Sequence, residues 1–236
     1  MPKSVLRTVE DVSSRRRWRP VFCNLSKPAA DNLDAISVAM HYPRRSVIHS
    51  EGQPCRGVFL VSAGRIKLSA TSSDGRAVII RFAGPGDILG LPETVAGRTY
   101  ETWATASESC EVDFIKRTDF LDLLNNHQNL AGEVLRALSD SYLSLIDSVR
   151  IRALIPTASK KLARFLLIWC EAGSNRGSSI RLTLTHEEIG QAIGSTRETV
   201  TRLLSIFKRK HLIELEHSLL LITDSPALRI HANSGV

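Results

Sequence analysis

The stretch THEEIGQAIGSTRETVTRLLSIFKRK, residues 185–210, determines how the rest of the chain is interpreted. Thr185 with Glu188 has the spacing of a capping box, in which a hydroxyl and a carboxylate satisfy free backbone amides at a helix start. Ser195 with Glu198 repeats that spacing further along the stretch. Two helix starts so close together predict two short helices joined by a tight turn.

The second of these helices has one apolar face and one polar face. Its apolar residues recur at i, i+3, i+4 and i+7, which predicts burial of Val200, Leu203, Leu204 and Phe207. Its polar face carries Arg197, Glu198, Thr201, Arg202, Ser205 and Arg209. Gly194 suits the sharp corner because glycine adopts the left-handed conformation without strain, and Gly190 leaves room for a close approach of the second helix. These features predict a helix-turn-helix whose second helix presents its N-terminal residues to a DNA major groove.

The polar face has the chemistry that reads base edges. Arginine can donate two hydrogen bonds to guanine, and glutamate can accept one from cytosine N4, each pair contributing roughly 1–3 kcal/mol of discrimination. The alternative interpretation is a solvated ion pair between Glu198 and Arg202, worth about 0.2–0.5 kcal/mol. The turn, the two caps and the basic flanks favour DNA reading.

The segment IGQAIGSTRETVTRLL resembles the helix-turn-helix signature of the cyclic AMP receptor/FNR (Crp/Fnr) family of bacterial transcription regulators. The resemblance implies that Arg197, Glu198 and Arg202 contact the bases of a TGTGA half-site. The FNR branch lacks the first arginine and has serine in place of Thr201, so this helix is closer to the cyclic AMP receptor type. We expect backbone or accessory contacts to DNA from Thr185, Ser195, Thr196, Thr201, Ser205 and Lys208.

The distribution of charge and the positions of the cysteines limit the class of protein. Of the net charge of +7, residues 1–20 hold six Lys/Arg against two Asp/Glu, and residues 156–236 hold eleven against seven. Basic ends around a nearly neutral middle fit phosphate contact by the C-terminal part. No run of about 18 apolar residues and no signal-peptide core is present, which predicts a cytoplasmic protein without a membrane partner. The scattered Cys23, Cys55, Cys110 and Cys170 do not form a disulfide framework.

The N-terminal half of the sequence predicts a tail, then a short helix, then a series of strands. Residues 1–19 are polar and basic and predict a flexible tail. The alternatives are that these residues contact DNA phosphates or dock on the domain that follows them. A short helix is predicted over residues 27–40. From about residue 43 to 114, regularly spaced glycines and an Asp-Gly hairpin signal after residues 66–71 predict an all-β roll or barrel. The resemblance implies a jelly-roll-like β-roll sensor of the cyclic-nucleotide-binding type over residues 20–127, in a chain of α+β class.

Residues 128–155 predict a long helix. Leu135, Leu138, Tyr142, Leu145 and Val149 step by three and four residues, which indicates a coiled-coil seam and a dimer interface. Packing of this helix on its own domain is the alternative from periodicity alone. The family resemblance implies pairing through the helix, and such a dimer suits half-sites roughly 34–36 Å apart.

Pro156 interrupts the helical pattern, and Thr157 is a suitable N-cap for the next helix. We expect a hinge here and a winged helix-turn-helix domain over residues 156–236. Residues 212–216 and 219–223 predict the two strands of the wing, with His217 at its tip.

The resemblance also predicts an effector pocket in the β-roll, lined by Gly86, Asp87, Gly90, Arg98, Thr99, Tyr100 and Glu101. Cyclic AMP binders of the family have Gly-Glu and Arg-Ser pairs where this chain has Gly90-Leu91 and Tyr100-Glu101. A carboxylate repels a phosphate, which argues against cyclic AMP as cofactor unless Arg98-Thr99 substitutes after a loop shift. The spread of the cysteines argues against an iron–sulfur cluster. A haem ligand such as His41 or His49, or a redox role for Cys55, remains an alternative to inert side chains.

The function predicted from these patterns is a homodimeric, sequence-specific transcription regulator, with double-stranded DNA and itself as partners, and RNA polymerase if it activates. The alternative is a ligand-binding or interaction module of the same fold without sequence-specific DNA binding. We expect no enzyme, because no catalytic Ser/His/Asp set, phosphate-binding glycine loop or metal-ligand spacing occurs in the sequence.

Overall fold

The structure is a computed structural model, which describes residues 22, 25–71, 75, 77–173, 179–181, 184–216 and 219–233. The predicted tail (residues 1–19), Cys23, most of the hairpin turn and the wing tip at residues 217–218 lie outside the described residues. None of the described helices has both the length and the apolar character needed to span a membrane.

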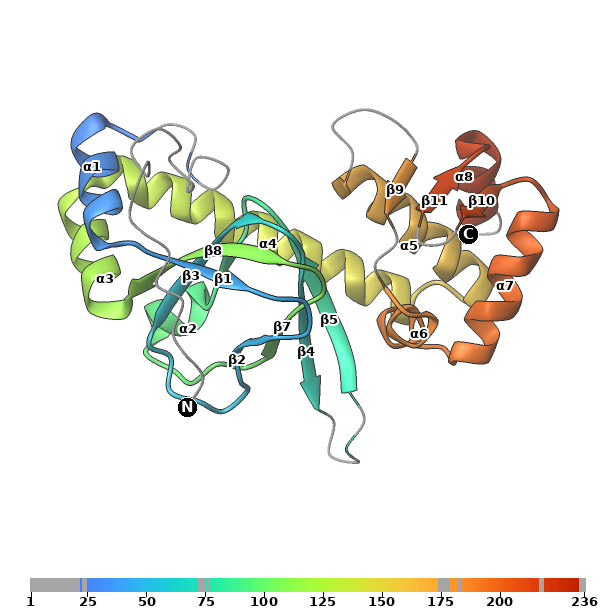
Figure 1. Cartoon of the computed structure of the whole chain (residues 1–236), viewed down its shortest axis with the longest axis horizontal. Helices are drawn as coiled ribbons and strands as arrows, with labels where there is room; N and C mark the ends of the chain where they lie inside the picture. The colour runs from blue at the N-terminus through green and yellow to red at the C-terminus, as the bar shows by residue number, and fades with distance from the viewer. Residues whose placement is uncertain are drawn as a thin grey trace.

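The N-terminal part folds as a β-roll flanked by helices, as predicted (Figure 1). Its helices are α1 (Lys27–Ile36), α2 (Leu91–Ala96) and α3 (Arg117–Asn126). Its strands are β1 (Val38–Tyr42), β2 (Val47–His49), β3 (Gly57–Ala63), β4 (Ile66–Thr71), β5 (Ala77–Ala83), β6 (Ile88–Leu89), β7 (Trp103–Ala106) and β8 (Cys110–Lys116). Within the described residues they pair as two antiparallel sheets, ordered β1-β8-β3-β6 and β2-β7-β4-β5. The predicted hairpin is confirmed, with Thr71 opposite Ala77.

Strand β3 shows how the β-roll is held together. Side chains alternate across a strand, so successive residues of β3 enter different cores. Val58 and Leu60 pack with the helices outside the roll, and Phe59 and Val61 pack in its interior. Because both faces are covered, Val58–Val61 are all buried.

The predicted helix over residues 27–40 is too long. Helix α1 ends at Ile36, and Ser37 already has an extended backbone, with its hydroxyl donating to the Leu33 carbonyl oxygen. Met40 lies on β1, opposite Val112 of β8. Pairing of β1 with β8 therefore determines the conformation of residues 38–40, which the sequence-based prediction assigned to the helix.

Helix α4 (Gln128–Ala153) runs from α3 along the β-roll to the C-terminal part (Figure 1). Leu130, Val134 and Ile151 are buried on the face that packs against the protein. Of the predicted seam residues, Leu135 is 64% exposed and Tyr142 is 62% exposed, and Leu145 and Val149 are also exposed. Leu138 differs, since it packs against the core shared by the β-roll and its helices.

The C-terminal part is a winged helix-turn-helix. It contains α5 (Ala158–Gly173), β9 (Ser179–Arg181), α6 (His186–Ile193), α7 (Arg197–Arg209), β10 (Ile213–Glu216), β11 (Leu219–Ile222) and α8 (Ser225–Asn233). The predicted wing strands pair as β10 and β11, and within the described residues β9 joins them as a third strand. Sequence reasoning predicted neither β9 nor α8.

The two parts touch through the β4–β5 hairpin and the segment after α4. Phe82 of β5 packs edge-on against Trp169 of α5, with ring centroids 4.7 Å apart. Lys67 Nζ lies 2.8 Å from Glu188 Oε1 of α6. At the predicted hinge, the Thr157 hydroxyl accepts from the Lys160 amide at 3.3 Å, as an N-cap does.

Candidate nucleic-acid interface

The first helix of the motif begins as the sequence predicts. The Thr185 hydroxyl accepts from the Glu188 amide at 3.1 Å, and the Glu188 carboxylate accepts from the Thr185 amide at 3.0 Å. Burial raises the pKa of Glu188. Hydrogen bonds from Lys67 and the Thr185 backbone, together with the charge of Lys67, lower this pKa by more, so it lies below its usual value. The Glu188 carboxylate is therefore ionised, and a negative charge is stabilised at the N-terminus of a helix.

The corner between α6 and α7 depends on its glycines. Gly194 has φ +67°, in the left-handed region. A Cβ on Gly190 would lie 2.7 Å from the Ser195 carbonyl oxygen, so the predicted close approach is real. The approaching group is the backbone of the turn.

The predicted capping box at the start of α7 is wrong by one residue. The N-cap is Thr196, whose hydroxyl accepts from the Thr199 amide at 3.3 Å. Ser195 belongs to the turn, because its amide donates to the Gly190 carbonyl oxygen at 2.8 Å. Glu198 is therefore the second helical residue and is not tied back to the amide of the cap.

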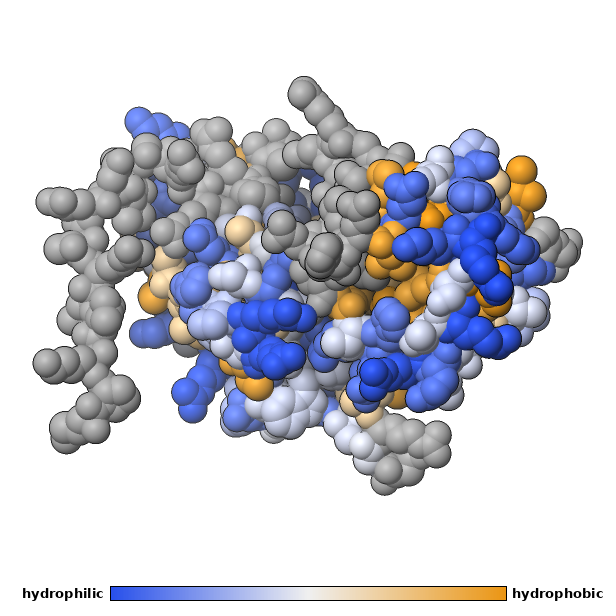
Figure 2. Space-filling view, turned by 45° about the vertical axis from the view of Figure 1, so that its right-hand side comes forward, coloured by the Kyte–Doolittle hydropathy of each residue, from blue (hydrophilic) through white to orange (hydrophobic). Residues whose placement is uncertain are grey.

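Helix α7 has the predicted faces. Val200, Leu203, Leu204 and Phe207 are buried in the core of the C-terminal part. Arg197, Glu198, Thr201, Arg202, Ser205 and Arg209 are exposed. Figure 1 shows α7 at the end of the molecule away from the β-roll, and Figure 2 brings this end forward, with hydrophilic side chains and apolar patches side by side.

The charged groups of this face are exposed. Among the described residues no ion pair joins Glu198 to Arg202, so the structure lacks the solvated pair that was the alternative interpretation. Hydrogen bonds from its own backbone amide and the Thr196 side chain, followed by the charge of Arg197, lower the pKa of Glu198. An ionised Glu198 is an acceptor, and the guanidinium groups of Arg197 and Arg202, for which the described residues provide no ion pair, are donors.

The predicted accessory residues surround this face but do not all offer free groups. Thr185 and Thr196 use their hydroxyls as caps. Thr201 and Ser205 donate to the carbonyl oxygens of Arg197 and Thr201, four residues earlier. Ser195 is half-buried, and Lys208 is exposed near the C-terminus of the helix with Arg209 and Lys210.

His186 is a residue of this face that sequence reasoning missed. Its Nδ1 lies 2.8 Å from the Thr201 hydroxyl oxygen, linking the first turn of α6 to α7. The Thr201 hydroxyl already donates to Arg197, so His186 Nδ1 donates to Thr201 and its Nε2 is left for another partner. The contact spans two helices, and spacing within one helix cannot reveal it.

The structure brings only some of the residues predicted for an effector pocket together: a Cβ on Gly90 would lie 2.8 Å from the Tyr100 ring. Tyr100 is buried and stacks on His49, with ring centroids 4.1 Å apart, and its hydroxyl donates to the Gly57 carbonyl oxygen at 3.0 Å. Asp87 pairs with Arg81 at 3.0 Å. Arg98 and Glu101 are exposed and lie 3.7 Å apart, Thr99 is exposed in a β-bridge with Pro54, and Gly86 lies in the turn before Asp87.

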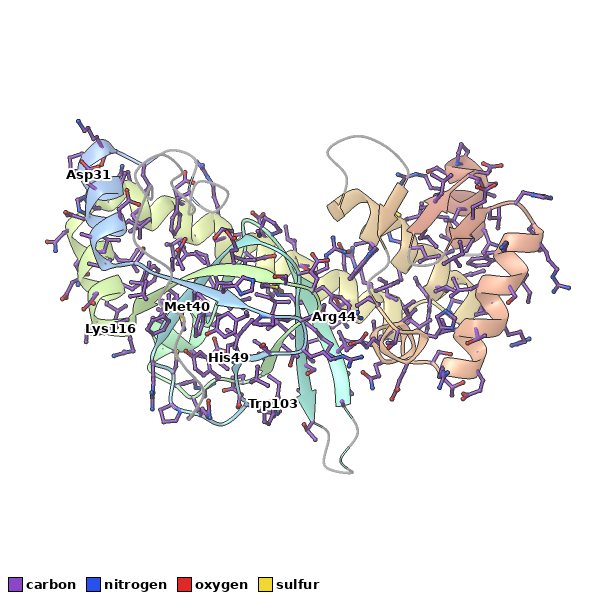
Figure 3. All side chains as sticks on the ribbon, viewed as in Figure 1. Asp31, Met40, Arg44, His49, Trp103 and Lys116 are labelled. Atoms are coloured by element: carbon purple, nitrogen blue, oxygen red, sulfur yellow. The ribbon has the colours of Figure 1, made fainter. Side chains whose placement is uncertain are left out.

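Two hollows flank the stacked His49 and Tyr100, and Figure 3 labels His49 inside the β-roll. One, of about 390 Å³, is lined by both rings together with Met40 and Phe59. The other, of about 300 Å³, lies beneath α4 and includes Gly90 among its walls. Glu93 also lines it, with one carboxylate oxygen buried and unpartnered, which opposes binding of a phosphate. The described residues contain no cluster of three His, Cys, Asp or Glu able to hold a metal ion.

Comparisons with known proteins agree with this architecture. Residues 39–127 match the family model of the cyclic nucleotide-binding domain, and residues 160–230 match that of the Crp-like helix-turn-helix domain. The Electron transport regulator A of Shewanella oneidensis is 28% identical over 80% of this chain and 76% of its own length. A CRP-like cAMP-activated global transcriptional regulator of Mycobacterium tuberculosis is 24% identical over 79% of this chain and 84% of its own length.

Solved structures share the fold. FixK2 from Bradyrhizobium japonicum superposes with a TM-score of 0.77 at 22% identity, covering 85% of this chain and all of that one. The paired domain matches, the related regulators and the winged helix-turn-helix with an exposed basic helix lead to one conclusion. The chain belongs to the Crp/Fnr family and is a DNA-binding transcription regulator.

Proposed function

We propose that the protein is a homodimer that reads a palindrome of TGTGA-like half-sites through Arg197, Glu198 and Arg202. The observation that carries this proposal is the exposed face of α7, where these three side chains stand without ion pairs to one another within the described residues. Two donors and one acceptor at the N-terminal half of a recognition helix match the hydrogen-bonding groups of guanine and cytosine.

The exposed apolar stripe on α4 supports the dimer. Leu135, Tyr142, Leu145 and Val149 recur at heptad spacing and are exposed, and Tyr142 and Leu145 also line the hollow beneath α4. An exposed heptad stripe of this kind is stabilised by burial against a second copy. Two-fold pairing also repeats the DNA-reading helix, as a palindromic site requires.

The proposed organisation assigns residues 1–19 to a tail, 20–127 to the sensor, 128–155 to the dimerisation helix and 156–236 to the DNA-binding domain. We propose a hinge at Pro156 and Thr157, between α4 and α5, and a signal received at the β-roll. RNA polymerase is the proposed further partner if the protein activates transcription.

Selection of bound sequences from random duplex DNA tests the specificity directly. We expect enrichment of a palindrome whose half-sites contain TGTGA, and a preference for that palindrome over a scrambled duplex at constant salt concentration. Equal affinity for the palindrome and the scrambled duplex would refute the proposed half-site.

A further inference from the structure

We propose that the cavity between the β-roll and the DNA-binding domain is a binding site for a small apolar carboxylic acid, held by Arg65 and Trp169. The cavity has a volume of about 440 Å³ and lies between β5, α4 and α5. It is distinct from the hollow that includes Gly90, because the two share only Ile80 and Arg81 among their lining residues.

Most of the wall is apolar. Ile79, Phe82, Ile151, Phe165 and Ile168 contribute aliphatic or aromatic surface from both domains. A volume of this size falls in the range of about 300–1,000 Å³ typical of small-molecule sites. The walls therefore favour a ligand with an apolar body over a sugar or a nucleotide.

Within the described residues, one cation of the wall has no ion pair and one N–H of the wall has no acceptor. The Arg65 guanidinium carbon lies 3.8 Å from the centre of the Trp169 ring, over its face. Among the described residues no carboxylate forms an ion pair with Arg65, although Glu108 is near enough to act on its charge. Trp169 is 4% exposed, and its buried Nε1 has no hydrogen-bond partner in the part of the chain that the structure describes.

A buried N–H without an acceptor and a partly buried cation without an anion are both costly. A carboxylate satisfies both requirements, because it accepts hydrogen bonds at two oxygens and carries the missing negative charge. Burial lowers the pKa of Arg65, with the charges of Glu108 and Cys170 acting in the opposite direction, as expected for an incompletely compensated cation.

The other charges of the wall are arranged differently. Asp87 is already satisfied, since it pairs with Arg81 and accepts from the Gly84 amide at 2.8 Å. Asp147 lies on α4 and is only half-buried, so water solvates it. Arg65 is thus the cation of the wall that is available to an anionic ligand.

Binding at this place deepens the proposed function and, for its effect on DNA, rests on it. A ligand between β5 and α5 bridges the sensor and the DNA-binding domain, so its affinity depends on their relative placement. By linkage, any factor by which the acid changes operator affinity must also appear as the factor by which the operator changes acid affinity.

Titration calorimetry with 3-phenylpropionate and with octanoate tests the site in the full-length protein. We expect saturable one-to-one binding of at least one acid, and the stronger of the two identifies an aromatic or an acyl body. The neutral 3-phenylpropionamide should bind at least about tenfold more weakly, because it cannot pair with a guanidinium group.

Two variants localise the binding. Arg65→Gln should weaken it at least about tenfold, and Trp169→Phe, which keeps a ring but removes the N–H, about two- to tenfold. Arg136→Gln is the matched control, since it removes the charge of an arginine side chain that is 71% exposed and lies outside the cavity wall. Thermal unfolding verifies that each variant is folded.

Absence of binding by both acids, or equal affinity of wild type and Arg65→Gln, would overturn the site. If the acid binds as expected but the protein does not prefer the TGTGA palindrome, the proposed half-site fails and the ligand site stands. Operator binding measured with and without the acid then shows whether the site regulates DNA binding, and equal affinities would overturn that coupling.

Discussion

The helix-turn-helix and the β-roll of this protein differ in how closely their functional residues match the pattern of the family. In the helix-turn-helix, Arg197, Glu198 and Arg202 match the family pattern, and the structure exposes them on one helix. In the β-roll, Tyr100-Glu101 stands where the resemblance predicts Arg-Ser, and the structure buries the tyrosine and exposes the glutamate. Membership of the family therefore predicts how this chain contacts DNA better than it predicts what the chain senses.

The difference has a structural cause. The proposed DNA-reading residues belong to one helix, so helical periodicity alone places them on a common face. A ligand cavity in the β-roll is assembled from several strands, from α2 and from α4, and each contributes only one or a few side chains. Replacing a few residues there changes the ligand without changing the fold.

The largest effect is expected from breaking the proposed dimer, on which the DNA-reading half depends. Leu135→Glu places a charge on the exposed stripe of α4 and should convert the dimer to a monomer, with operator affinity reduced by about 100-fold or more. The loss is large because the second half-site no longer binds at a high effective concentration. Sedimentation and operator titration measure the two consequences.

Leu135 is a better test site than Leu138, because Leu138 is partly buried against the protein's own core and its substitution would also change stability. The matched control is Leu143→Glu, because Leu143 is 59% exposed on α4 but lies outside the stripe. Equal behaviour of the two variants would show that the stripe is not the interface.

The next effect tests whether the β-roll interior is a dry aromatic cluster. Burial lowers the pKa of His49 to about 4, with the Thr102 backbone opposing this. In the unfolded chain histidine has a pKa of about 6.5, so between these values the unfolded state binds more protons, and acid destabilises the fold. We expect a loss of about 3 kcal/mol between pH 7 and 4 that depends on His49.

Urea unfolding across that pH range, for the wild type and for His49→Phe, measures this loss. The variant changes the absolute stability, but it should also remove the part of the pH dependence that His49 causes. If the free energy of unfolding depends on pH in the same way for both proteins, His49 is already solvated or paired, and the stacked His49 and Tyr100 leave the interior open to water.

A smaller effect is expected at a single base pair. Arg197→Ala should lose about 1–3 kcal/mol of discrimination at one guanine of each half-site, because the bidentate donor is removed. Lys208→Ala should instead weaken binding to all sequences and reduce its salt dependence, as the loss of a phosphate contact does. If Arg197→Ala behaves like Lys208→Ala, Arg197 contacts the phosphate backbone.

Sequence reasoning predicted what depends on local periodicity and missed what depends on contacts between distant segments. The buried face of α7, the Thr185 cap and the β4–β5 hairpin follow from spacing. Strand β9 was missed because it forms only by pairing with β11, and α2 because its six residues are too few to show a helical period. The contact of His186 with Thr201 and the unpaired Arg65 arise from packing between elements.

The smallest effect concerns the residue that caps α7. Thr196→Ala should cost about 1 kcal/mol of stability, since it removes the acceptor of the Thr199 amide. Ser195→Ala should cost only a few tenths, because the Ser195 backbone, rather than its side chain, closes the turn. Thr196→Ser keeps the hydroxyl and serves as the control, and urea unfolding ranks the three variants.

The ranking bears on DNA reading as well as on stability. With Ser195 as the cap, Glu198 would be the third helical residue and its carboxylate would turn back to the backbone, as that of Glu188 does in α6. With Thr196 as the cap, Thr199 takes that position and Glu198 stays on the exposed ridge between Arg197 and Arg202. A larger loss from Ser195→Ala than from Thr196→Ala would therefore remove Glu198 from the set of base-reading residues.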